Sequence, residues 1–194
     1  MTRFSLLLAL CLSACSAVNH ASAPLDAYTL QPLPVAQGVA GSRHLVVELP
    51  TASGALTTDR ILIKPNALQA EYLPNGRWVD PVPELLQTLL VASLQNAGGF
   101  RLVGRDGAGM TPDFVVLTEV NDFQAETIAT GTQVRVALTL SVLAAADHRL
   151  IATHRFDATE PASTSDTLTL VSAFDQATRR ILSEAVTWVS RQAR

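Results

Sequence analysis

Residues 114–124 read FVVLTEVNDFQ, and two further stretches of the same kind follow at 133–144 and 150–159. In each, apolar residues, many of them β-branched, alternate with polar ones, which is typical of a β-strand with one buried face. The links between them, at 125–132 and 146–149, are too short to hold a crossover helix. The three stretches are therefore expected to form an antiparallel meander.

The N-terminal half supplies shorter strands. The pattern of apolar residues predicts them at 27–30, 44–49, 60–63, 67–73 and 100–103. Pro65-Asn66 separates two of these strands, and Pro74-Asn75-Gly76 is expected to form a hairpin turn.

Two segments have the periodicity of amphipathic helices. The first follows Asp80-Pro81-Val82-Pro83, has leucines at helical spacing and ends at Gly98-Gly99. The second begins near Ser165-Asp166 and has one apolar stripe from Leu168 to Val189. Together the elements predict an α+β fold with a mostly antiparallel sheet, a C-terminal three-strand meander and two helices packed on one face.

The N-terminus has the features of a bacterial lipoprotein leader. Arg3 precedes an apolar run at 4–12, and Leu12-Ser13-Ala14-Cys15 has the spacing of a lipobox. In a lipobox the cysteine thiol takes a diacylglyceryl group before the leader is cleaved. Cys15 is therefore the expected lipidation site, and a plain secretory leader with a coincidental cysteine is the alternative.

This interpretation divides the chain into three parts. Residues 1–14 form the signal peptide, residues 15–26 a lipidated tether, and residues 27–194 a single periplasmic α+β domain. The apolar run of the leader is shorter than the roughly 20 residues that span a bilayer, so lipids should be the only anchor. Ser16 stands where many inner-membrane lipoproteins of proteobacteria have aspartate, so the outer membrane is the expected location.

Composition argues against several classes of function. The chain has 14 Lys and Arg against 17 Asp and Glu, and such a mildly acidic balance argues against a nucleic-acid partner. Cys11 lies in the leader and Cys15 is acylated, so no thiol is left for catalysis, disulfides or metal. The sequence has no G-x-S-x-G, no H-E-x-x-H and no glycine-rich phosphate loop. We expect no enzyme activity and no cofactor.

Two further arrangements of polar residues are weaker candidates for a site. Asp147, His148 and His154 are the nearest approach to a metal cluster, but they lack tight ligand spacing, so no metal is expected. Glu119 and Asp122 lie on opposite strand faces by parity. Only a bulge between them would let the two carboxylates share a substrate.

Short motifs over nearly the whole chain resemble a known family. They are the lipobox, Tyr28-Thr29-Leu30, Asp59-Arg60-Ile61, Tyr72 with Arg77-Trp78, Pro83-Glu84-Leu85-Leu86, Asp122-Phe123-Gln124, Ala173-Phe174 and Trp188-Val189. On these motifs the chain resembles the ABC-type transport auxiliary lipoproteins, the paraquat-inducible-protein-C-like partners of MCE-type lipid transport systems. The resemblance implies a periplasm-facing lipoprotein that assists a transporter moving lipid or another hydrophobic substrate between the two membranes. The periplasmic MCE-type subunit of that transporter is the expected partner.

Arg60, Tyr72 and Arg77 are the candidate partner-binding residues among these motifs. Exposed together, they could bind a partner strand or an anionic headgroup. Alternatively, Arg60 forms only a solvated ion pair with Asp59, which is worth little. Trp78 is expected to be a core anchor rather than a ligand platform.

The predicted strands 45–49 and 60–63 are candidate sheet edges. An exposed edge has unpaired N–H and C=O groups and can accept an extended segment of another chain. Pro50 and Pro65 would limit uncontrolled pairing there, or they only end the strands.

Three functions fit these features. The first is an auxiliary scaffold of an MCE-type transport system, the second a direct lipid carrier, and the third an unrelated outer-membrane assembly factor. A carrier needs an apolar pocket of several hundred Å3. The chain has only six Phe, two Trp and two Tyr to build its interior, which favours the scaffold.

Overall fold

The computed structural model describes residues 25–36, 38, 41–106, 109 and 111–194 of the chain. The predicted signal peptide at 1–14, the lipidation site Cys15 and the tether as far as Pro24 lie outside these residues. Among the described helices, none is both long and apolar enough to cross a membrane.

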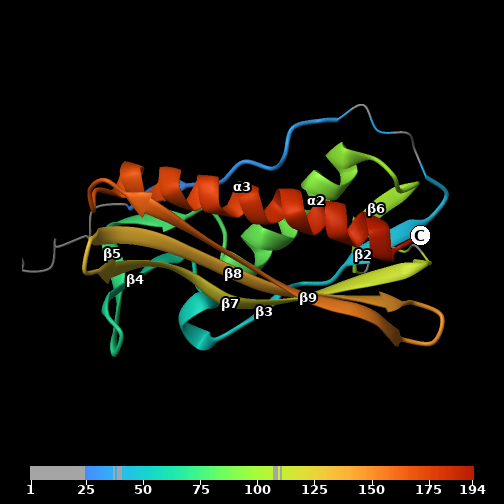
Figure 1. Ribbon diagram of the computed structural model, residues 1–194, viewed down its shortest axis with the longest axis horizontal. Helices are drawn as coiled ribbons and strands as arrows, with labels where there is room; N and C mark the ends of the chain where they lie inside the picture. Colours follow the sequence, from blue (N-terminus) through green and yellow to red (C-terminus); the bar gives the residue numbers. More distant parts are fainter. Residues whose placement is uncertain (1–24, 37, 39–40, 107–108, 110) are drawn as a thin grey trace, which may run out of the picture.

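Three long strands form the largest part of the sheet (Figure 1). They are β7 (Phe114–Ile128), β8 (Gly131–Ala144) and β9 (Arg149–Ala162). β8 pairs antiparallel with β7 on one side and with β9 on the other. β7 continues past the predicted end at residue 124, so that only residues 129–130 connect it to β8.

The other edge of β7 receives three short strands in succession. β2 (His44–Val47), β3 (Thr51–Ala52) and β4 (Arg60–Asn66) each pair parallel with a different part of β7. β5 (Gln69–Trp78) returns antiparallel to β4. The remaining two strands, β1 (Asp26–Tyr28) and β6 (Leu102–Arg105), pair parallel with β5 and β2.

The sheet is mixed, so the prediction of a mostly antiparallel sheet is wrong. Five of the eight pairings among the described strands are parallel. Parallel pairing needs a long connection, and α2 (Val82–Ala97) lies on the path that brings the chain from β2 back to β6. The α+β class and the two long helices are confirmed.

The predicted turn at Pro74-Asn75-Gly76 is also wrong, because these residues lie inside β5. The chain reverses at residues 67–68 instead. The register between β4 and β5 shifts between the pairs Leu62 with Tyr72 and Arg60 with Arg77. Pro74 falls in this irregular stretch, where the missing proline N–H interrupts no regular ladder.

Both helices lie on the same side of the sheet (Figure 1). α2 follows Pro81, carries Pro83 in its first turn and ends at Gly98, whose φ of 72° suits a residue without a Cβ. α3 (Thr167–Gln192) packs against β8 and β9. Its N-cap is Asp166, whose carboxylate accepts a hydrogen bond from the Thr169 N–H at 3.1 Å.

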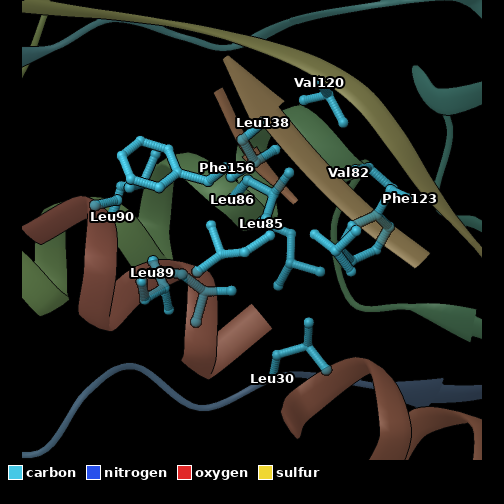
Figure 2. Close-up of a cluster of buried hydrophobic side chains, with 14 of the residues drawn as sticks. Leu30, Val82, Leu85, Leu86, Leu89, Leu90, Val120, Phe123, Leu138 and Phe156 are labelled. Atoms are coloured by element: carbon cyan, nitrogen blue, oxygen red, sulfur yellow. The ribbon is translucent and has the colours of Figure 1, made fainter. Parts of the chain in front are cut away.

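Three aromatic side chains from distant parts of the chain meet in the core. Trp78 of β5, Phe123 of β7 and Phe174 of α3 are all at most 1% exposed, and their ring centroids lie 4.9 to 5.6 Å apart. Figure 2 shows Phe123 in one cluster with Leu85 and Leu86 of α2. Trp78 is therefore a core anchor, as predicted.

The cap of α3 makes the stability of the fold depend on pH. The hydrogen bond from the Thr164 hydroxyl has the largest effect on the Asp166 carboxyl, and hydrogen bonds from Thr169 add to it. Together they lower the pKa of Asp166 from 3.8 to about 2. The carboxylate therefore stabilises the folded state above about pH 4, and this contribution is lost as the pH falls toward 2. Asp166→Asn keeps an oxygen acceptor but does not titrate, so we expect its Tm to fall less than that of the wild type over this range.

Thermal unfolding followed by circular dichroism at a series of pH values measures this difference. Asp166→Ala removes the cap itself and is expected to lower Tm at every pH. Parallel pH profiles for Asp166→Asn and the wild type would show that Asp166 does not carry the effect.

Candidate functional site

The structure brings the three predicted partner-binding residues together at the base of the β4–β5 hairpin. Arg60 begins β4, and its Cα lies opposite that of Arg77 in β5. The guanidinium carbon of Arg60 lies 5.6 Å from the centroid of the Tyr72 ring, which is a cation–π distance. We call these three residues the hairpin cluster.

Each side chain of the hairpin cluster has a different partner. The ion pair of Asp59 is formed with Arg77, at 3.1 Å, and not with Arg60 as the alternative interpretation assumed. The Tyr72 hydroxyl donates to the carbonyl of Ala55 at 3.2 Å, in the short helix η2 (Gly54–Leu56). Arg60 donates from Nη2 to the carbonyl of Leu73 at 3.4 Å.

The guanidinium of Arg60 has few hydrogen-bond partners within the described part of the chain. A guanidinium has five N–H donors. In Arg60, Nη2 makes a single long hydrogen bond, to the carbonyl of Leu73. Its Nε is buried and lacks a hydrogen-bond partner among the described residues. Two guanidiniums next to one carboxylate leave a net positive charge, which suits a carboxylate or a row of carbonyl oxygens from another molecule.

The edge strands are not the ones that the sequence predicted. The predicted strand 45–49 corresponds to β2, which lies between β6 and β7, and 60–63 to β4, which lies between β5 and β7. Both are therefore interior strands. Among the described strands, β9 pairs on one side only, and β5 has no partner opposite β4 before Gly76. Tyr72 lies in this open part of β5.

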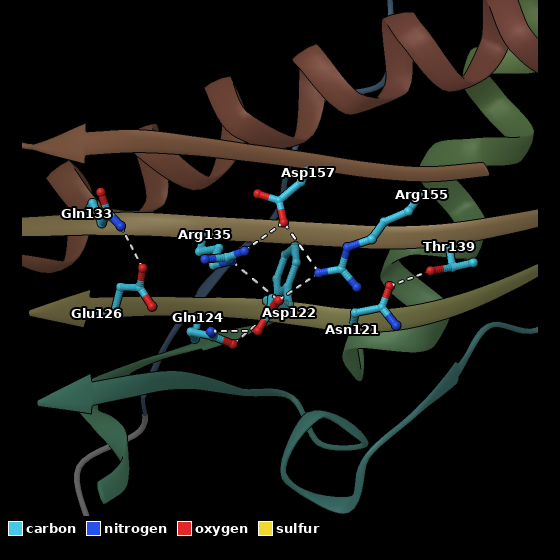
Figure 3. Close-up of polar contacts among 10 residues, drawn as sticks. Asn121, Asp122, Gln124, Glu126, Gln133, Arg135, Thr139, Arg155 and Asp157 are labelled. Atoms are coloured by element: carbon cyan, nitrogen blue, oxygen red, sulfur yellow. Dashed lines mark hydrogen bonds and ion pairs between the residues drawn. The ribbon is translucent and has the colours of Figure 1, made fainter. Parts of the chain in front are cut away.

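A second polar cluster lies on the sheet face opposite the helices (Figure 3). Arg135 of β8 contacts Asp157 at 2.9 Å and Asp122 at 3.4 Å. Arg155 of β9 contacts the same two carboxylates at 3.4 and 3.3 Å. The four charges neutralise one another, and the hydrogen bond to Asp157 raises the pKa of Arg135.

A β-bulge builds this cluster and corrects the expectation for Glu119 and Asp122. The pairing of β7 with β8 shifts between Val120 and Asp122. As a result Glu119 lies opposite Thr139 and Asp122 lies opposite Ala137, two residues apart on β8 and on the same face. Asp122 is held by two arginines, so the geometry fits a structural ion network better than a pair of catalytic carboxylates.

At the other end of the sheet an open groove of about 550 Å3 is lined by Arg43, Asp113 and His148, among others. The backbone N–H of His44, at 2.8 Å, and Arg43, at 3.0 Å, lower the pKa of Asp113. His154 lies apart from this groove, with its ring 4.7 Å from Phe156. In the described part of the chain, no group of three or more His, Cys, Asp and Glu could hold a metal.

Comparison with known families decides which class of protein has this architecture. The model of the family described as ABC-type transport auxiliary lipoprotein component matches residues 28–186. The chain belongs to this family. The expectation drawn from the short motifs is confirmed. The description of the family names a lipoprotein component that is auxiliary to ABC-type transport.

Individual relatives are consistent with this assignment. An uncharacterised protein of Bradyrhizobium diazoefficiens is 28% identical over 151 residues, which are 76% of this chain and 39% of the relative. This chain thus spans about two fifths of that relative's length. A crystal structure of a DUF330 protein from Xanthomonas campestris superposes with a TM-score of 0.79 at 23% identity, covering 88% of this chain and 96% of the other.

A more distant structure has the same fold. A hypothetical protein from Chlamydia trachomatis superposes with a TM-score of 0.54 at 9% identity, covering 80% of this chain and 98% of the other. At such identities the two superpositions establish the fold alone.

Proposed function

We propose that this chain is an outer-membrane-anchored periplasmic lipoprotein that acts as an auxiliary scaffold of an MCE-type lipid transport system. Membership of the ABC-type transport auxiliary family is the observation that carries the proposal. Signal cleavage after residue 14 would leave lipidated Cys15, a tether at 15–26 and the folded domain at 27–194. Ser16 is the basis for placing the anchor in the outer membrane.

The packing of the described core favours a scaffold over a lipid carrier. A carrier needs a sizeable apolar cavity. Here Trp78, Phe123 and Phe174 fill the space between sheet and helices, with their rings in contact. The open groove near Arg43 and Asp113 is lined partly by charged side chains, which is a poor environment for an acyl chain.

The hairpin cluster is the proposed contact with the periplasmic MCE-type subunit. The unpaired part of β5, residues 69–75, can accept an extended segment through main-chain hydrogen bonds. Tyr72 lies on this segment and Arg60 lies over the Tyr72 ring. Arg60 would then donate to a carboxylate or carbonyl of the incoming segment and fix its position.

Arg60→Ala is expected to reduce co-purification of the MCE-type subunit about tenfold or more. The reason is the loss of a charge-assisted hydrogen bond, worth about 1.5 to 3 kcal/mol. Tm is expected to fall by no more than about 4 °C, because Tyr72 is 39% exposed and a cation–π contact at such a partly exposed site contributes about 1 kcal/mol. The measurement is quantitative mass spectrometry of protein purified from solubilised envelopes.

Arg43→Ala is a matched control for this experiment. Arg43 pairs with Asp113 at 3.0 Å and lies 6.0 Å from the ring centroid of Phe114, so the substitution removes similar interactions just before β2, in another part of the sheet. We expect Arg43→Ala to keep the partner. An intact complex with Arg60→Ala, equal losses for both variants, or unfolding of Arg60→Ala would count against the hairpin cluster as the contact.

A further inference from the structure

Four segments of the chain come together at one end of the molecule. β4 and β7 run parallel toward this end, where the turns at 67–68 and 129–130 follow them. β9 also ends there, since its Ala162 pairs with Thr132 at the start of β8. Figure 1 shows the start of α3 at the same end, opposite the C-terminus of the chain.

The path of the chain into the domain also starts at this end. β1 is parallel to β5, with Asp26 opposite Gly76, so the chain enters from the side where β5 begins. A Cβ on Gly76 would lie 2.9 Å from Thr167 and 3.1 Å from Tyr28, so β1, β5 and the first residue of α3 are in contact here. Cys15 precedes Asp26 by 11 residues, which reach at most about 40 Å when extended.

Exposed apolar side chains lie at this end, in or next to its turns. Leu68 is 99% exposed, Leu168 68% and Ile128 38%. Leu168 was expected in the buried stripe of the C-terminal helix, but its position in the first turn of α3 leaves it in solvent. The turns at 67–68 and 129–130 contain only Ala, Leu and Thr, whereas the connection 163–166 contains Ser, Thr and the capping carboxylate of Asp166.

The opposite end of the molecule, here named the charged end, has charged side chains in its connections. The connection between β8 and β9 contains Asp147 and His148 and leads directly into Arg149. The segment 101–106 contains two arginines and an aspartate, and the last four residues of the chain contain two arginines. Exposed apolar side chains beside turns with few charges favour a membrane interface, whereas clustered charges favour water.

We propose that Leu68, Ile128 and Leu168, here named the apolar end, rest on the bilayer that holds the acyl chains of Cys15. The inference depends on the anchor assigned under the proposed function. The short tether holds the apolar end at a high local concentration near the lipid, so even a small patch can stay in contact. The domain would then stand upright on the membrane, with the Arg43 groove facing away from it.

Site-specific fluorescence on the full-length lipidated protein tests this orientation. Acylation blocks the thiol of Cys15, so Leu68→Cys and Leu168→Cys each offer one reactive thiol for an environment-sensitive label. In phosphatidylcholine vesicles with doxyl-labelled lipid, a side chain at the interface lies about 5 to 10 Å deep. We therefore expect roughly two- to threefold stronger quenching at both positions than at a water-exposed control.

Leu150→Cys is the matched control. Leu150 is 57% exposed and lies next to the turn between β8 and β9, at the charged end. Quenching at 68 and 168 that equals the quenching at 150, in protein shown by mass spectrometry to be acylated, overturns the orientation and leaves the proposed anchor intact. Absence of acylation overturns both. Burial of the label without quenching by lipid would indicate contact with another protein and would also overturn the proposal.

Discussion

Phe174→Ala is expected to lower the free energy of unfolding by about 3 to 5 kcal/mol, because it leaves a cavity between α3 and the sheet. Phe174 is fully buried, and its ring lies 5.1 Å from that of Trp78 and 4.9 Å from that of Phe123. The neighbouring rings come from β5 and β7 and cannot both move into the space. Urea unfolding followed by fluorescence of Trp78 and Trp188 measures the loss.

Leu168→Ala is the control on the same helix. Leu168 is 68% exposed, so we expect a change within about 0.5 kcal/mol. A loss below about 1 kcal/mol for Phe174→Ala would show that the three aromatic rings do not close the core as described.

Cys15→Ser is expected to move the protein almost entirely from the membrane to the soluble periplasmic fraction. Each buried CH2 of an acyl chain contributes about 0.8 kcal/mol to membrane binding, and serine cannot take the diacylglyceryl group. Cys11→Ser, four residues earlier in the leader, is the matched control and should remain anchored. Fractionation with immunoblotting measures both variants.

Two outcomes would contradict the anchor as proposed. Persistence of Cys15→Ser in the membrane after a high-salt wash, in cells without the transport system, would show that another segment binds lipid. Density-gradient separation that placed the wild type wholly in the inner membrane would contradict the interpretation of Ser16.

Local patterns in the sequence were enough to predict most of the elements. Alternation from Phe114 onward and the leucines of the first helix depend on neighbouring residues only, so they identified the long strands and α2. Pairing depends on long-range contacts. Nothing local to His44–Val47 or Arg60–Asn66 shows that these strands lie inside the sheet, parallel to β7.

In the candidate site, too, the residues could be predicted from the sequence but their contacts could not. Arg60, Tyr72 and Arg77 were recognisable as motif residues, but only the fold shows that Arg60 lies over Tyr72 while Arg77 pairs with Asp59. The cluster around Asp122 was missed because it depends on a bulge. One extra residue between Val120 and Asp122 reverses the parity of the strand, and charges at 135, 155 and 157 are too far apart in sequence to indicate an ion network.

In the proposed complex, the hairpin cluster contacts the periplasmic subunit of an MCE-type transporter. Photo-crosslinking in living cells tests it most directly, with benzoylphenylalanine in place of Tyr72, whose ring is partly exposed at the open edge of β5. The same substitution at His148, at the charged end, is the control. We predict a crosslink from position 72 to the MCE-type subunit and none from position 148. The absence of that crosslink at position 72, or its appearance equally at both positions, would contradict the claim.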